Sequence, residues 1–184
     1  MTNGVSHDDR LIVRIATADD LEAVAQVECA AFGGHAEAEL VRALAQDATA
    51  YLPELSLLAE GASGLAGHVL FTRAWTGGGA RAVLLAPLAV APARQNAGVG
   101  SLLVREGLDR ARQRGFEVAL VLGDPRYYGR FGFTPARAFG ILPPYPVDPE
   151  EAWMALELVP GSLARAAGPV AVANAFMEPA LWRE

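Results

Sequence analysis

The stretch from Ala82 to Leu122 restricts the fold more than any other part of the chain. It contains an apolar run at Ala82–Val90, a helical pattern at Gly98–Arg114 and a second apolar run at Val118–Leu122. A strand without polar residues, such as Val118–Leu122, is typical of a central strand that is buried on both faces of a sheet. The order strand, helix, strand therefore predicts a crossover connection between neighbouring parallel strands.

The helical pattern is amphipathic, because its apolar residues fall on one side and its charged residues on the other. Gly115 is a natural stop for this helix. Pro87 interrupts the preceding strand, and because proline cannot donate to a sheet ladder, it signals a bulge or an unpaired edge. The apolar side is predicted to consist of Leu103, Val104, Leu108 and Ala111.

The flanking segments predict antiparallel strands and two further helices. Leu55–Glu60 and Leu65–Arg73 form a hairpin around a Gly/Ser turn. Thr17 is the expected N-cap of a helix that ends at Gly33-Gly34, and a second helix follows at about Ala36–Gln46. The apolar face of the first helix is expected to include Leu21, Val24, Ala25 and Cys29. Further strands are expected at Leu11–Ile15, from Phe133 onward and at Trp153–Leu158. The fold class is α/β or α+β with a mixed sheet.

The organisation predicted along the chain is a tail at residues 1–9, one domain at 10–160 and a C-terminal extension at 161–184. Ile141–Pro149 is a rigid proline-rich loop. Val170–Val172 is expected to form an edge strand, so that the extension packs on the domain or on a second subunit, which would make a homodimer.

Composition excludes several classes of function. All 15 basic residues are arginine, so lysine-dependent Schiff-base or P-loop chemistry is excluded. A net charge of −6 without a basic cluster argues against nucleic-acid binding. We find neither a signal peptide nor a membrane span, and the single cysteine, Cys29, fits the cytoplasm. The three histidines lack metal-ligand spacing, so no metal is expected.

The segment between Leu88 and Leu103 is the most informative for chemistry. A strand ends, a tight loop contains Gly98-Val-Gly100, and a helix begins. Free N–H groups and the positive end of the helix dipole converge there, which favours a pyrophosphate site. An ordinary loop whose glycines only serve the turn is the alternative. A Rossmann dinucleotide motif is excluded because its third glycine position holds Leu103 and seven residues separate the strand from Gly98.

Two motifs resemble the GNAT superfamily of acyl-CoA-dependent N-acyltransferases. Gln95-Asn-Ala-Gly98-Val-Gly100 is similar to its acetyl-CoA loop, and Tyr127-Tyr-Gly-Arg-Phe-Gly-Phe133 is similar to its Phe-Tyr-x-Lys-x-Gly-Phe segment. With Leu88-Ala-Val90 and Gly123-Asp-Pro125, the sequence looks most like the YhbS-like branch of predicted acetyltransferases. The resemblance spans about residues 11–158.

The resemblance implies a V-shaped splay between Leu88–Val90 and Val118–Leu122, with acetyl-CoA as co-substrate. The pantetheine arm would pair with the backbone of Leu88 and Val90, and Ala89 would also belong to the cofactor site. Tyr128 would lie next to the thioester sulfur, where it would contact the cofactor and protonate the departing thiolate. Amides of the following loop would hold the pyrophosphate, namely those of Gln95, Asn96, Ala97, Gly98, Val99, Gly100 and Ser101. Tyr127 is expected to be a packed aromatic residue, and Arg130 to face solvent.

The implied reaction is direct attack by a neutral amine in a ternary complex, with a backbone N–H near Val90 stabilising the oxyanion. Asp124 is interpreted first as a helix cap. The predicted strand Ala82–Val90 carries no carboxylate, which leaves the general base open. Its candidates are Glu28, His35, Glu37 and Glu54.

Two other functions stay open: a non-catalytic acyl-CoA-binding sensor and a protein-interaction scaffold. The acceptor is expected to be a small-molecule or peptide amine. Its side of the site should be walled by residues 32–39 and by 140–149, with Phe139, Tyr145 and Trp153 making that wall aromatic.

Overall fold

The computed structural model describes residues 10–182; the predicted tail at 1–9 lies outside them. Most of the strands form one mixed sheet, in the order β1-β2-β3-β4-β5-β8-β6. Its strands are β1 (Ile12–Ile15), β2 (Tyr51–Gly61), β3 (Gly64–Thr76), β4 (Arg81–Val90), β5 (Val118–Leu122), β6 (Thr134–Pro135) and β8 (Trp153–Glu157). Two short strands, β7 (Ile141–Leu142) and β9 (Gly168–Ala171), pair with each other, and β9 also pairs with β3.

The predicted crossover is confirmed. Strands β4 and β5 are parallel and are joined by helix α3 (Val99–Gln113), whereas β5 and β8 are antiparallel. Alternation along β4 and β5 sends successive side chains to opposite faces of the sheet. Val83, Leu85 and Val121 share one core with the apolar side of α3, and the predicted residues Leu103, Val104, Leu108 and Ala111 are all buried there.

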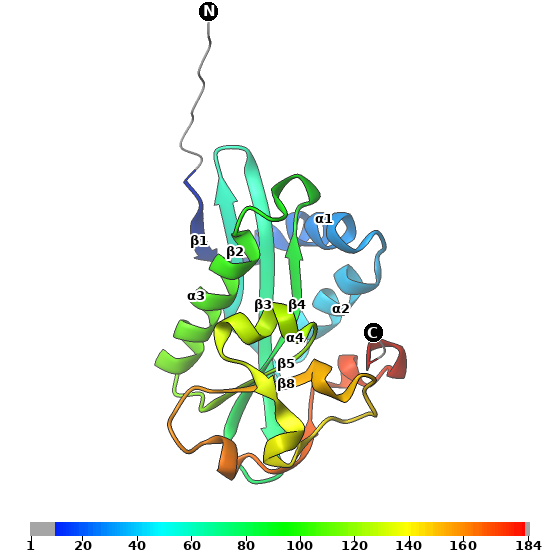
Figure 1. The fold of residues 1–184 in the computed structure, drawn as a ribbon. Helices are drawn as coiled ribbons and strands as arrows, with labels where there is room; N and C mark the ends of the chain where they lie inside the picture. The colour runs from blue at the N-terminus through cyan, green and yellow to red at the C-terminus, as the bar shows by residue number, and fades with distance from the viewer. Residues whose placement is uncertain (1–9, 183–184) are drawn as a thin grey trace, which may run out of the picture.

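The opposite face is covered by α1 (Leu21–Phe32), α2 (Ala36–Ala45) and the C-terminal segment. Figure 1 shows the C-terminal segment, in red, next to α2. Phe176 and Trp182 belong to the core on this face, together with Leu44 and Trp153. The segment after residue 160 therefore contributes to the same hydrophobic core as the central strands.

Helix α1 begins later and faces the core differently from the prediction. Thr17 precedes a single 3₁₀ turn, Ala18–Asp20, and its N–H and hydroxyl donate to the Asp20 carboxylate at 2.7 and 2.9 Å. Val24 and Ala25 are buried as expected, but Leu21 is 41% exposed. The buried face is instead completed by Val27 and Glu28.

Three smaller expectations are also corrected. The strand expected from Phe133 begins at Thr134 and has two residues, because only these pair with β8. The proline-rich loop starts with strand β7, which pairs with β9 of the same chain. Cys29, expected to be buried, is half-buried, and its Sγ lies 3.1 Å from Nδ1 of His35.

Candidate active site

The loop before α3 presents unpaired amides at the helix N-terminus. Gly98 is the N-cap, with φ of 84°, and Asn96 also has a left-handed φ of 61°. The first helical bond of α3 runs from Leu102 N–H to Gly98 C=O, so the amides between them have no acceptor within the helix. Together with the helix dipole, these N–H groups favour an anion such as pyrophosphate.

Strand β4 leaves β5 beside this loop. The two strands pair only from Ala82 with Val118 to Leu85 with Val121. The register between β3 and β4 shifts at Ala86-Pro87, so the bulge predicted from Pro87 is confirmed. Beyond the bulge, β4 continues to Val90 without pairing to β5, which is the predicted splay.

The free edge of β4 directs backbone groups into the splay. Ala91 N–H donates to Ala66 C=O at 2.9 Å. Val90 on β4 and Gly67 on β3 therefore lie opposite each other as a non-hydrogen-bonded pair. By alternation, the N–H and C=O groups of Leu88 and Val90 point away from β3. Gln95 Nε2 donates to the Val90 carbonyl at 3.3 Å, which ties the loop to this edge.

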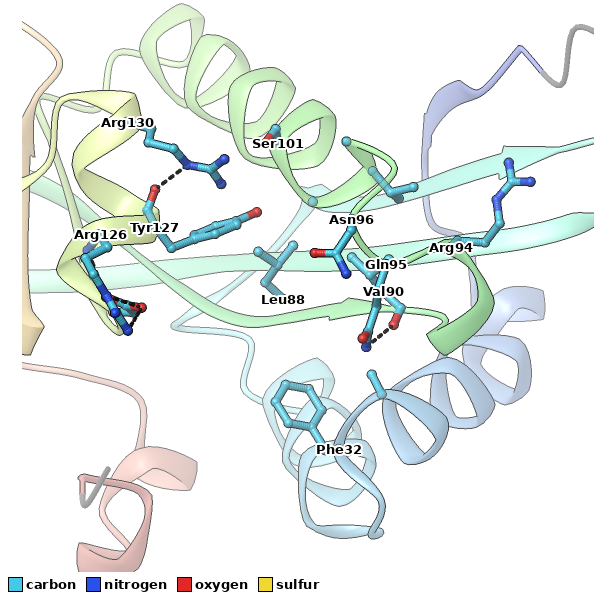
Figure 2. Close-up of a pocket in the computed structure, with 15 residues that line it drawn as sticks. Phe32, Leu88, Val90, Arg94, Gln95, Asn96, Ser101, Arg126, Tyr127 and Arg130 are labelled. Carbon is cyan, nitrogen blue, oxygen red and sulfur yellow. Dashed lines mark hydrogen bonds and ion pairs between the residues drawn. The ribbon is translucent and has the colours of Figure 1, made fainter.

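The loop and the free edge line a cavity of about 810 Å³, which we call the loop cavity. Figure 2 shows Leu88 and Val90 between the end of α1 and the start of α3, with Tyr127 pointing toward Ser101. Three residues predicted to bind the cofactor do not line it: Ala89 is fully buried, and Ala97 and Tyr128 are absent from the lining. The other predicted residues do, namely Leu88, Val90, Gln95, Asn96, Gly98, Val99, Gly100 and Ser101.

Tyr127 takes part in this site, contrary to the expectation that it only packs. Its hydroxyl is hydrogen-bonded to Ser101 and lies 2.5 Å from where a Cβ on Gly100 would be. Burial raises the pKa of the Tyr127 phenol, and the Ser101 hydrogen bond and Arg130 oppose that rise. The Arg130 guanidinium lies 4.4 Å from the Tyr127 ring centroid and also lines the cavity, so it does not face solvent alone.

A second cavity, of about 560 Å³, adjoins the first, and we call it the aromatic cavity. Phe32, Leu88, Asp124 and Tyr127 line both cavities, so the two meet where β4 and β5 separate. Tyr128, the predicted catalytic residue, lines only the aromatic cavity, and its ring packs against Gly123.

The structure places the three aromatic residues expected in the acceptor wall away from the junction of the two cavities. None of Phe139, Tyr145 and Trp153 lines the aromatic cavity. Tyr145 and Trp153 line a separate cavity under the proline-rich loop, and both pack against Trp182. The wall comes instead from Phe32, Tyr127, Tyr128, Phe176 and Trp182. No sequence motif marks the last two, because their role depends on how the C-terminal segment folds back.

The four base candidates occupy different environments. Glu28 is fully buried, with its Oε1 2.6 Å from His68 Nδ1, and His68 Nε2 lies 3.2 Å from Ser56 Oγ. Burial raises the pKa of Glu28 more than the His68 hydrogen bond lowers it. This buried network was missed because its members are far apart in the sequence.

The other three candidates for the general base differ in whether they reach a cavity. His35 pairs with Cys29, and Glu54 lies near Arg114 with an ion-pair distance of 3.8 Å, where it lines neither cavity. Glu37, in the first turn of α2, lines the aromatic cavity. It is therefore the one candidate of the four that reaches either cavity.

Asp124 is a helix cap, as predicted. Its Oδ1 accepts from Arg126 N–H at 2.8 Å at the start of α4 (Pro125–Tyr128). Its carboxylate also pairs with the Arg126 guanidinium, which lowers the pKa of Asp124. These contacts occupy the Asp124 carboxylate even though the residue borders both cavities.

Two further properties concern residues 10–182 as a whole. In this part of the chain, no group of three or more His, Cys, Asp or Glu side chains is placed to hold a metal ion. None of its helices combines the length and the apolar character that crossing a membrane requires.

Comparison with known proteins agrees with this geometry. Residues 21–133 match the acetyltransferase (GNAT) family model. Over 146 residues, 76% of this chain and 80% of the relative, the sequence is 43% identical to an uncharacterized N-acetyltransferase, YjhQ, of Escherichia coli. The crystal structure of E. coli YhbS in complex with CoA superposes with a TM-score of 0.83, at 30% identity over 91% of this chain and 92% of that one.

A second solved structure is similar. It is a GNAT family acetyltransferase from Brucella melitensis in complex with acetyl-CoA, with a TM-score of 0.74 and 31% identity over 91% of this chain and 99% of that one. The family match extends over the splay, the loop before α3 and the Tyr127–Phe133 segment. The chain belongs to the GNAT family of N-acetyltransferases, in its YhbS-like branch.

Proposed function

We propose that this protein transfers an acetyl group from acetyl-CoA to a primary amine by direct attack in a ternary complex. The observation that carries the proposal is the junction of two cavities at the splay, with an anion-binding helix N-terminus on one side and an aromatic wall on the other. The CoA and acetyl-CoA complexes of the two similar structures support the choice of co-substrate.

The loop cavity suits the co-substrate in three ways. Amides at the α3 N-terminus, from Gly98 to Ser101, bind the pyrophosphate, and the lysine-free chain relies on these N–H groups and on arginine. Leu88 offers its N–H and C=O, and Val90 its N–H, to the amides of the pantetheine arm, as a sheet edge does to an added strand. The thioester then lies near the junction, where Leu88 and Tyr127 border both cavities.

The transfer needs three contributions from the chain. Glu37 takes a proton from the ammonium, directly or through water, so that the neutral amine attacks the thioester carbonyl. A backbone N–H near Val90 stabilises the developing oxyanion. As the new N–C bond forms and the C–S bond breaks, Tyr128 donates its phenolic proton to the sulfur, since a thiolate of pKa about 8.5 leaves more readily when it is protonated.

The neighbouring tyrosines allow a matched test. We expect Tyr128→Phe to lower kcat by about 10²-fold or more with little change in CoA affinity, because a general acid contributes about that much. Tyr127→Phe should instead change the KM for acetyl-CoA more than kcat, because its hydroxyl lies at the α3 N-terminus. Equal losses in both variants would contradict the separate roles.

The proposal as a whole is tested by thiol release with acetyl-CoA and an amine panel, and by calorimetry with CoA. Turnover of any primary amine supports transfer. Tight CoA binding without turnover would favour the acyl-CoA sensor. Absence of CoA binding would refute both functions and leave the interaction scaffold.

A further inference from the structure

The aromatic cavity has a chemical character that restricts the acceptor. Its wall is built from three separate parts of the chain: the α1–α2 region, the separating ends of β4 and β5 with α4, and the C-terminal segment. Most of its lining is apolar or aromatic: Phe32, Leu40, Leu84, Leu85, Ala86, Pro87, Leu88, Leu122, Phe176, Leu181 and Trp182, together with the two tyrosines. A strongly polar acceptor would lose hydration here and gain few hydrogen-bond partners in return.

Within the described part of the chain, two carboxylates line the cavity, and only one is available to a ligand. Asp124 is engaged by Arg126, both through the α4 cap and through an ion pair at 3.0 Å. Glu37 forms no ion pair with any residue between 10 and 182. Among residues 10–182, no arginine lines this cavity. It therefore offers one unmatched negative charge, at the start of α2, within an apolar surface.

We propose, building on the function proposed above, that the acceptor is a primary monoamine with an aromatic or branched alkyl body. The body lies against Phe32, Phe176 and Trp182, and the ammonium is held by Glu37. A polyamine would place a second cation against apolar side chains without a carboxylate to pair with it, at a large desolvation cost. A cavity of about 560 Å³ accommodates one ring or a branched chain together with the acetyl end of the co-substrate.

The first experiment compares acceptors at saturating acetyl-CoA. We expect kcat/KM for 2-phenylethylamine and isopentylamine to exceed that for spermidine and ethanolamine by at least about tenfold. Equal values, or a preference for spermidine, would overturn the inference while leaving acetyl transfer itself established.

Substitutions then test whether the Glu37 carboxylate binds the ammonium group of the acceptor. Glu37→Gln should lower kcat/KM for 2-phenylethylamine by at least about tenfold and leave the affinity for CoA unchanged. Glu39→Gln is the matched control, because Glu39 lies on the same helix but is exposed and outside the cavity. Leu181→Asp adds a second carboxylate to the lining, on the C-terminal segment, and should raise the ratio of spermidine to 2-phenylethylamine turnover. An unchanged ratio, together with wild-type activity in Glu37→Gln, would refute the assignment.

A binding measurement separates this inference from the proposed function. If no amine is turned over, calorimetry of 2-phenylethylamine with the CoA-bound protein tests whether the monoamine site exists. Binding to the wild type that is lost in Glu37→Gln supports the monoamine site even though catalysis has failed. Absence of binding overturns it.

Discussion

Gly107 sets how closely helix α3 approaches the sheet, and Gly107→Ala tests this directly. An ideal Cβ at this position would lie 2.1 Å from Cε2 and 2.6 Å from Cζ of Phe71 on β3. Phe71 is fully buried in the core beneath α3. The helix therefore rests on the Phe71 ring at a place where its own surface has no side chain.

The change in the free energy of unfolding expected for Gly107→Ala is the balance of two opposing effects. Ordinary contact begins at 3.4 Å, so either the ring or the helix must move by about 1 Å, and overpacking of a core costs about 1–3 kcal/mol. Replacing glycine by alanine inside a helix gains about 1 kcal/mol. Because the contact is so short, we take the upper end of the cost and expect a net loss of about 2 kcal/mol, or a Tm lower by about 4–8 °C in a domain of this size.

The assay is thermal unfolding followed by circular dichroism, with CoA calorimetry on the same samples. Gly129→Ala is the matched control, because its Cβ would meet nothing within 4 Å and its backbone is helical. Phe71→Leu should make Gly107→Ala less costly, so that the double variant loses less than the sum of the single ones. A Gly107→Ala protein as stable as the wild type would refute the reasoning.

Three other changes have defined outcomes. Gly100→Ala should weaken CoA binding in calorimetry, because its Cβ would press on the Tyr127 hydroxyl, and adding Tyr127→Phe should restore much of the loss; no recovery in the double variant would argue against that contact. Burial raises the pKa of Glu28 beside His68, so the protonated carboxyl stabilises the fold. This contribution to the free energy of unfolding is complete below about pH 4.5 and is lost as the pH rises through the folded-state pKa. Urea unfolding from pH 4 upward should show the wild type losing stability relative to Glu28→Gln, and parallel curves would contradict this. Asp124→Ala should cost about 1 kcal/mol in the same assay, whereas Asp124→Asn, which keeps a capping oxygen, should cost less.

Local patterns were sufficient for the central part of the fold. Strand β5 has the predicted bounds, the buried side of α3 is the predicted one, and the bulge lies at Pro87. In each case the signal comes from residues close together in the sequence, through side-chain periodicity or through the missing N–H of proline. The turn at Gly98–Gly100 was identified in the same way, because a helix N-terminus presents free amides whatever surrounds it, whereas Gln95 was assigned through the resemblance to the family's acetyl-CoA loop.

Tertiary structure alone decided which side chains meet at the two cavities. The Glu28–His68 contact spans 40 positions, and Phe176 and Trp182 reach the aromatic cavity only because their segment packs beside α2. Glu37 and Glu54 are both acidic residues in the sequence, yet only Glu37 lines either cavity. Such contacts depend on the packing of elements that are distant in the chain. The sequence therefore determined the α3 loop and the splay, and the packing determined the lining of the aromatic cavity.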